Sequence, residues 1–159
     1  MQIATWNVNS IRTRLEHVKT WLEEVQPDLL CLQETKVEDS LFPSSAFAEQ
    51  GYQVNFHGQK AYNGVAMVSR IPLEDIKVGL NGELPDDQNA NSLSEQKRVI
   101  SALVDGIRVI NVYVPNGSAL HSEKYQYKLN WLNCLSKYLD AQKNRGEPIC
   151  ILGDFNIAL

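Results

Sequence analysis

The order of apolar and polar positions predicts a strand, a helix and a second strand in the first 34 residues. Residues 2–8 are rich in β-branched and aromatic side chains, as is typical of a strand. Apolar residues then recur every three or four positions from Ile11 to Val25, which predicts an amphipathic helix that Pro27 ends. Residues 28–34 start as an unbroken apolar run, which indicates a strand buried on both faces.

The middle of the chain favours short strands. Four segments are predicted strands because they are short and rich in β-branched or aromatic residues: 52–57, 64–69, 98–104 and 107–114. The last two flank Asp105-Gly106, a dipeptide that predicts a tight hairpin. A short helix is expected at 44–50, and the polar, turn-rich residues 80–96 are expected to form a solvated loop.

The last part of the chain returns to a helix followed by a strand. Apolar spacing predicts a long helix from about 121 to 144, and residues 148–152 form one more apolar strand that runs into Gly153-Asp154-Phe155-Asn156. The whole order predicts an α/β fold with a mixed β-sheet and helices on one face. The apolar strands also need cover on their other face, and no segment of the chain is an obvious candidate to supply it.

Composition narrows the class of protein. The 159 residues are 43% hydrophobic and 21% charged, and the net charge of −4 argues weakly against a passive nucleic-acid-binding module. The three cysteines lie in apolar contexts without metal-binding spacing, so we expect reduced thiols. The first residues lack the features of a secretory signal, and no apolar run approaches the roughly 20 residues of a membrane span. We therefore expect a cytoplasmic protein that does not bind membranes.

Polar side chains follow the ends of the apolar strands. Asn7 and Asn9 follow the first strand, Glu34 follows the second, and Asp154 and Asn156 follow the last. In α/β sheets, ligands collect outside the carboxyl ends of parallel strands, so we expect these groups to converge. All of them offer hard oxygen atoms, and a divalent cation would offset the repulsion between two nearby carboxylates. The pattern therefore predicts a site for Mg²⁺ or Mn²⁺.

Each of these residues also has an ordinary structural interpretation. An asparagine at a strand end is commonly a turn former or a helix cap, and a glutamate after a strand is commonly a surface residue. His17, His57 and His121 have no nearby serine or aspartate in a triad-like arrangement. The sequence contains neither a GxGxxG nor a GxxxxGK[ST] motif, which argues against the usual dinucleotide and P-loop sites.

Several motifs occur in an order that resembles a known family. They are Ala4-Thr5-Trp6-Asn7-Val8-Asn9, Leu32-Gln33-Glu34-Thr35-Lys36, Asn63-Gly64-Val65-Ala66, Asn111-Val112-Tyr113-Val114-Pro115-Asn116-Gly117 and Leu152-Gly153-Asp154-Phe155-Asn156. Together they resemble the exonuclease III branch of the endonuclease/exonuclease/phosphatase superfamily, which includes the apurinic/apyrimidinic endonucleases. The resemblance implies a four-layer α/β/β/α sandwich, and we expect its second sheet to come largely from a later half of the protein.

The resemblance also implies roles for individual residues. Asn7 and Glu34 would lie at the metal site, with Asp154 and Asn156 beside them. Asp154 would orient or deprotonate the attacking water, and Asn156 would hold the phosphate as charge develops. The hydroxyl of Tyr113 would reach the phosphate. Two further asparagines would lie close to the DNA substrate: Asn9 and Asn116.

The implied activity is metal-dependent hydrolysis of phosphodiester bonds during DNA base excision repair. The substrate would be double-stranded DNA, cut at abasic sites or degraded from its 3′ ends. Family members carry a further aspartate and a terminal Ser-Asp-His block in a later half, so we expect residues 1–159 to be the N-terminal part of a single domain, with apolar strands 29–32 and 107–114 left exposed. Two alternatives stay open: a non-catalytic fragment that assembles with a missing C-terminal half, and a superfamily phosphatase that acts on another phosphoester.

Overall fold

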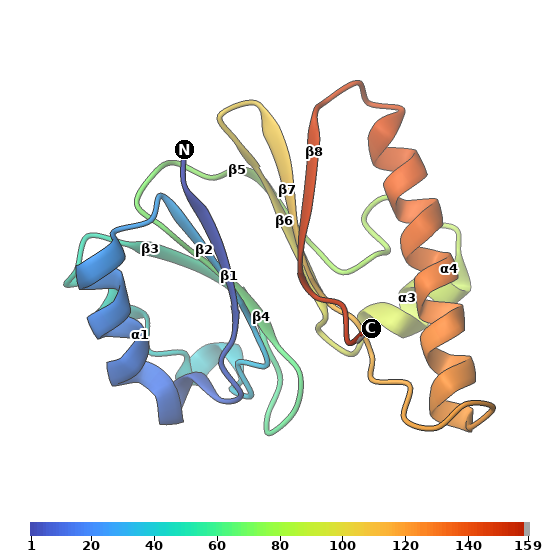
Figure 1. The fold of residues 1–159 in the computed structure, drawn as a ribbon. Coiled ribbons are helices and arrows are strands. Elements are labelled where there is room, and N and C mark those ends of the chain that lie inside the picture. The colour runs from blue at the N-terminus through green and yellow to red at the C-terminus, as the bar shows by residue number, and fades with distance from the viewer. Residues whose placement is uncertain (158–159) are drawn as a thin grey trace.

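Two four-stranded sheets form the centre of the molecule (Figure 1). The computed structural model describes residues 1–157. Sheet A has the strand order β1-β2-β4-β3 and sheet B the order β5-β6-β7-β8. The strands of sheet A are β1 (Ile3–Asn7), β2 (Leu29–Gln33), β3 (Gln53–His57) and β4 (Val65–Ser69). Those of sheet B are β5 (Glu74–Val78), β6 (Val99–Val104), β7 (Ile107–Tyr113) and β8 (Ile149–Asp154).

Each sheet contains one parallel pair that is joined through a helix. Helix α1 (Ile11–Val25) connects β1 to β2, and helix α4 (Glu123–Lys143) connects β7 to β8. All other neighbouring strands are antiparallel. Three shorter helical segments lie in the connections: η1 (Asp39–Leu41), α2 (Ser44–Ala48) and α3 (Gln88–Ser94). Because parallel neighbours end on the same side, each pair delivers two strand ends to one edge of its sheet.

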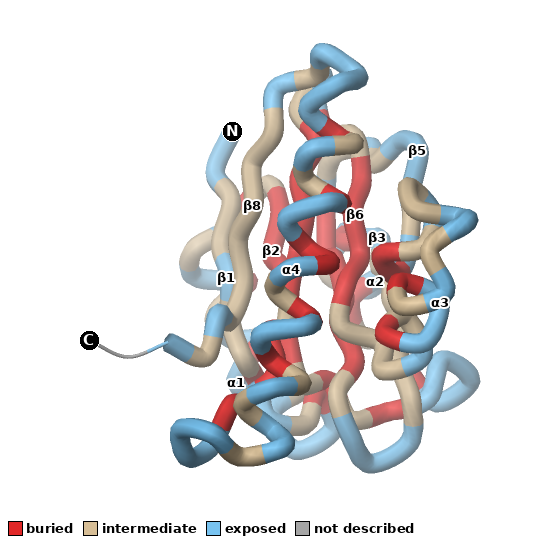
Figure 2. The backbone as a smooth tube through the Cα atoms, turned by 90° about the vertical axis from the view of Figure 1, so that its right-hand side faces the viewer, coloured by how far each residue is buried: buried red, intermediate tan, exposed pale blue. Residues whose placement is uncertain are grey.

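The sheets pack face to face, and helices cover their outer faces (Figure 1). Buried residues of α1 and sheet A form one apolar cluster, and those of α3, α4 and sheet B form another. A third cluster fills the interface between the sheets and includes Cys31, Met67, Ile100 and Val109. Figure 2 shows the central strands β2 and β6 as buried, whereas β1 and β8 at one edge are only partly buried.

The expectation that the second sheet comes from a later half of the protein was wrong, as was the single sheet with helices on one face. Residues after β4 form sheet B within this chain, and helices lie on both outer faces. The predicted exposure of strands 29–32 and 107–114 was also wrong. All of β2 is buried, and so is most of β7, because each sheet covers the other. The four-layer α/β/β/α arrangement itself is confirmed.

Two elements were missed in polar segments. Strand β5 is an edge strand whose side chains are mostly exposed, so its sequence lacks the apolar run of a buried strand. Helix α3 lies within the segment that was predicted to be a loop. The side chain of Asp87 caps its first turn, and only Ala90 and Leu93 are buried. One small apolar contact per turn gives too weak a periodic signal to predict a helix.

The structure also tests two expectations from the sequence: the state of the cysteines and the absence of a membrane-spanning helix. Cys31 and Cys134 are buried free thiols, as expected, while Cys150 is a free thiol that is only partly buried. None of the helices in residues 1–157 combines the length and the apolar character that a membrane span requires.

Candidate active site

The side-chain amide of Asn7 joins two carboxylates that come from different sheets. Its Nδ2 atom donates to Glu34 Oε1 at 2.8 Å and to Asp154 Oδ2 at 2.7 Å. Asn7 ends β1, Glu34 follows β2, and Asp154 ends β8. Because the two carboxylate oxygens share one donor atom, they lie close together, as the positions of the strand ends predicted.

Glu34 has an unusual backbone and a well-defined charge environment. Its φ of 52° lies in the left-handed region, which turns the chain sharply at the end of β2. Its Oε2 pairs with Lys36 Nζ at 2.9 Å. Burial raises the pKa of Glu34, but hydrogen bonding by Asn7, Lys36 and Tyr113 outweighs this effect and holds the pKa below its ordinary value. Glu34 is therefore an anion at neutral pH.

Asp154 is positioned by the close pairing of β7 and β8. Gly153 has a φ of 136° and pairs with Val112, and a Cβ atom at position 153 would lie 2.0 Å from the carbonyl oxygen of Val112. Only glycine permits this approach. The next residue, Asp154, pairs with Tyr113 across the sheet and directs its carboxylate toward Asn7. Its Oδ1 also accepts a hydrogen bond of 2.9 Å from the backbone N–H of Asn156.

Tyr113 faces Glu34 from the end of β7. Burial, followed by the interaction with Glu34, raises the pKa of Tyr113 to about 12, so its hydroxyl keeps its proton at neutral pH. The guanidinium carbon of Arg98 lies 4.6 Å from the centre of the tyrosine ring, a cation–π contact, and Nη1 of Arg98 donates to the backbone oxygen of Tyr113 at 3.2 Å. Arg98 therefore holds both the ring and the backbone of Tyr113.

The two asparagines predicted to lie near the substrate are at the rim. Asn9 is exposed; its backbone N–H donates to Asn7 Oδ1 at 3.1 Å, and its side-chain oxygen accepts from Lys36. Asn116 is also exposed, and its side-chain oxygen accepts from the backbone N–H of Ser118 at 2.8 Å. Asn116 lines a surface hollow of about 610 Å³ together with Tyr113 and other residues. Neither asparagine is hydrogen-bonded to the two carboxylates.

Three cationic residues support the site, and sequence reasoning did not assign them to it. Lys36 pairs with Glu34, Arg98 stacks on Tyr113, and Lys128 donates to the backbone oxygen of Asn156 at 2.6 Å. Each of these contacts depends on how the chain turns or on pairing between distant segments, and no sequence motif encodes such contacts.

The donor set fits a hard divalent cation in its chemistry. Among residues 1–157, no group of three or more His, Cys, Asp or Glu side chains is placed to hold a metal ion. The site instead offers two carboxylates and amide oxygens, which suits Mg²⁺ because that ion keeps several water ligands. Asn7 presents its amide nitrogen to the carboxylates here, so an oxygen ligand from Asn7 would require the amide to turn over and release Asn9.

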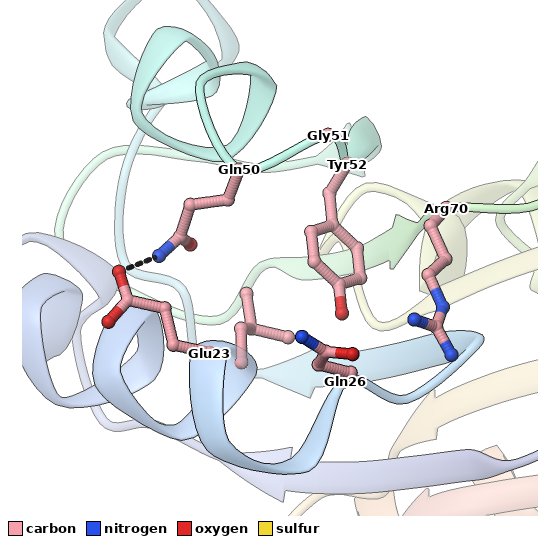
Figure 3. A pocket seen from close by; sticks show the side chains of 7 residues that line it. Glu23, Gln26, Gln50, Gly51, Tyr52 and Arg70 are labelled. Carbon is pink, nitrogen blue, oxygen red and sulfur yellow. Dashed lines mark hydrogen bonds between the residues drawn. The ribbon is translucent and has the colours of Figure 1, made fainter.

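A separate cavity lies away from these residues, beside α1 and the segment that leads into β3. It has a volume of about 370 Å³ and is lined by Leu22, Glu23, Gln26, Gln50, Gly51, Tyr52 and Arg70 (Figure 3). Gln50 donates to Glu23 at 2.8 Å across it, and the Tyr52 hydroxyl donates to the backbone oxygen of Pro27 at 3.2 Å. None of the predicted site residues lines this cavity.

Comparisons with known proteins agree on one family. A model described as the Endonuclease/Exonuclease/phosphatase family matches residues 4–159. The chain is 35% identical over 163 residues to exodeoxyribonuclease III of Haemophilus influenzae, and the match covers 99% of this chain and 58% of that protein.

Solved structures give the same result. An AP endonuclease from Archaeoglobus fulgidus matches with a TM-score of 0.88 and 46% sequence identity, over 99% of this chain and 58% of that one. A 3′ phosphatase from Neisseria, bound to a product DNA hairpin, matches with a TM-score of 0.88 and 45% identity, also over 99% and 58% of the two chains. This chain therefore spans less than two thirds of the length of these relatives.

Proposed function

The chain belongs to the endonuclease/exonuclease/phosphatase family, and from this premise we propose that its site hydrolyses phosphodiester bonds in DNA with a divalent cation. The observation that carries the proposal is the bridge from Asn7 to the carboxylates of Glu34 and Asp154. Two carboxylates from different sheets are brought to one point, where a cation would offset the repulsion between them.

The carboxylates and amides would hold the cation, and the remaining groups would act on the substrate. Glu34 and Asp154 are the principal candidate ligands, with the amide oxygens of Asn7 and Asn156 as further ones. A bound Mg²⁺ or Mn²⁺ would supply Lewis-acid stabilisation of charge on the phosphate. The carboxylate of Asp154 is oriented by Asn7 and by the N–H of Asn156, which supports its role as the group that orients or deprotonates the attacking water.

Tyr113 and Asn156 would stabilise the phosphate. Because the pKa of Tyr113 is raised to about 12, its hydroxyl stays protonated and can donate a hydrogen bond to a phosphate oxygen at neutral pH. Nδ2 of Asn156 donates to the backbone oxygen of Val114 at 2.7 Å, which fixes the plane of its amide. Asn9 and Asn116 lie at the rim, where they would contact the DNA backbone.

We propose double-stranded DNA with abasic sites or free 3′ ends as the substrate. Relatives named as an exodeoxyribonuclease, an AP endonuclease and a 3′ phosphatase bound to DNA support this class of substrate. We also propose that residues 1–159 form the N-terminal part of a single domain. Within residues 1–157, β1 and β8 are edge strands at which further strands could pair, and this supports the proposed organisation.

The test is incision of a duplex that contains one abasic-site analogue, using the purified protein in Mg²⁺ and after chelation with EDTA. We expect Asp154→Asn and Glu34→Gln each to reduce incision about a hundredfold or more, because each removes a charge that the site requires. The matched control is Asp86→Asn, which neutralises an exposed aspartate and should leave incision unchanged. Near-normal incision by Asp154→Asn would contradict the proposal.

The same assay separates the alternatives. Incision by a monomer of residues 1–159 would reject a non-catalytic assembly half. Release of phosphate from a 3′-phosphorylated DNA hairpin, without incision at abasic sites, would instead favour a phosphatase, the activity named for the Neisseria relative.

A further inference from the structure

Lys128 lies in the second turn of α4, on the face that packs against sheet B. The residue is only 9% exposed and lies one turn before the buried Trp131. A lysine is rarely buried unless its ammonium group finds partners. Here Nζ reaches backbone oxygens just beyond β8: that of Asn156 at 2.6 Å and that of Phe155 at 3.5 Å.

The path of this side chain is shaped by its neighbours. A Cβ atom on Gly117 would lie 3.2 Å from Cδ of Lys128, so the absence of a side chain at position 117 leaves room for the lysine stem. The stem therefore passes beside Gly117 and connects α4 to the segment after Asp154. A solvated surface lysine would not need this space.

Asn156 is the point at which the turn after β8 is fixed. Its φ of 50° lies in the left-handed region. Its N–H donates to Asp154 Oδ1 at 2.9 Å, its Nδ2 donates to the Val114 oxygen at 2.7 Å, and its own oxygen accepts from Lys128. Removal of the ammonium group would release the last of these three contacts and leave the turn held from one side only.

We propose that Lys128 is a positioning residue that fixes the turn of Asp154 and Asn156 from helix α4. Its ammonium group holds the backbone oxygen of Asn156, so that the N–H of the same residue stays directed at the carboxylate of Asp154. This inference rests on the proposed function for its catalytic consequence, but its structural part can be measured without metal or DNA.

The first experiment is amide hydrogen exchange on the metal-free chain. Lys128→Met keeps the length of the stem and removes the donor, and we expect the Asn156 N–H to exchange at least tenfold faster than in the unmodified chain. Lys128→Arg restores a donor and should recover most of the protection. The control is Lys137→Met on the same helix, which removes a surface pair with Asp87 at 3.1 Å and should not alter exchange in the turn.

The second experiment measures kcat and KM for incision of the abasic duplex, together with the affinity for Mn²⁺ alone. We expect Lys128→Met to lower kcat at least tenfold with KM changed less than threefold, and to weaken Mn²⁺ binding severalfold, whereas Lys137→Met changes none of these. A general loss of folding would lower kcat in proportion to the unfolded fraction, without faster exchange confined to the turn.

The outcomes separate the two proposals. Unchanged exchange at Asn156 in Lys128→Met overturns the positioning role, whatever the activity. If the Asn156 N–H exchanges faster in Lys128→Met but kcat is unchanged, the positioning role is also overturned, provided that Asp154→Asn is inactive. If Asp154→Asn retains normal incision, the proposed function itself fails. If Lys128→Met does not fold, Lys128→Leu, which also lacks a donor, takes its place, and unchanged exchange at the Asn156 N–H of that variant overturns the inference.

Discussion

The side-chain amide of Gln33 donates a hydrogen bond of 2.7 Å to the side-chain oxygen of Asn111, across the interface between the two sheets. Both residues are fully buried. Nδ2 of Asn111 then donates to the backbone oxygens of Leu32 and Ala66, each at 3.0 Å. Gln33 precedes Glu34 in the sequence, and Asn111 lies on the strand that ends at Tyr113. These bonds therefore align the two halves of the candidate site.

Asn111→Leu tests this alignment. The variant removes one of the three acceptors of the Gln33 amide and a donor to two backbone oxygens in a buried interface. We expect it to lower the free energy of unfolding by about 2–4 kcal/mol. Urea denaturation measures the effect. Asn130→Leu is the control, because Asn130 is exposed and its side chain bonds with that of Asn89 at the surface. Equal stability of the two variants would contradict the prediction.

Gly153→Ala tests the close approach of β8 to β7. The new Cβ atom would lie 2.0 Å from the Val112 oxygen, and the φ of 136° is unfavourable for alanine. We expect a loss of about 3 kcal/mol or more in the free energy of unfolding, since a backbone atom cannot move aside cheaply. The control is Gly82→Ala, whose Cβ atom would meet nothing within 4 Å. Similar melting temperatures for the two variants would show that β8 does not pack tightly enough against β7 at position 153 to exclude a side chain.

His57 predicts a pH dependence of stability. Burial, and then the charge of Lys97, lower its pKa from 6.5 to about 4 in the folded protein. Between these values the unfolded chain binds a proton that the folded chain does not, so the stability falls as the pH falls from about 6.5 to about 4. His57→Gln should remove this part of the dependence, whereas His17→Gln, an exposed position, should keep it. Urea denaturation midpoints at several pH values measure the stability of both variants. Identical pH profiles for His57→Gln and His17→Gln would contradict the role of His57.

Tyr113→Phe tests the hydroxyl that faces Glu34. The ring, its contact with Arg98 and the apolar burial are kept, while the protonated donor is lost. We expect kcat for incision to fall between about tenfold and a thousandfold with little change in KM, because the hydrogen bond would be made chiefly in the transition state. Tyr62→Phe, at a residue that is 70% exposed, should have no effect. A rise in KM alone would assign Tyr113 to substrate binding.

The strand ends could be predicted because a general rule applies to them. Asn7, Glu34 and Asp154 each follow an apolar strand, and parallel strands that are joined through helices end on the same side. The same residues identify the family motifs. Sequence reasoning could therefore place these three side chains in one region without knowing the distance between them.

The partners of these residues could not be predicted in the same way. Lys128 donates to the backbone oxygen of Asn156, which lies 28 positions later in the sequence. The bond between Gln33 and Asn111 joins residues that are 78 positions apart. Such contacts depend on how two sheets stack, and local periodicity carries no information about stacking. The second sheet was assigned to a later half of the protein for a related reason: three of its strands were predicted, but local periodicity does not show which sheet a strand joins.

The bond between Asn7 and Asp154 joins positions separated by 147 residues. Asp154 is synthesised 147 positions after Asn7, so the contacts that join Asn7, Glu34 and Asp154 cannot form before β8 has been made. Contacts of such long range form late in folding. Nascent or misfolded copies consequently lack the assembled charge pair, and the chemistry that depends on it is confined to molecules that have completed both sheets.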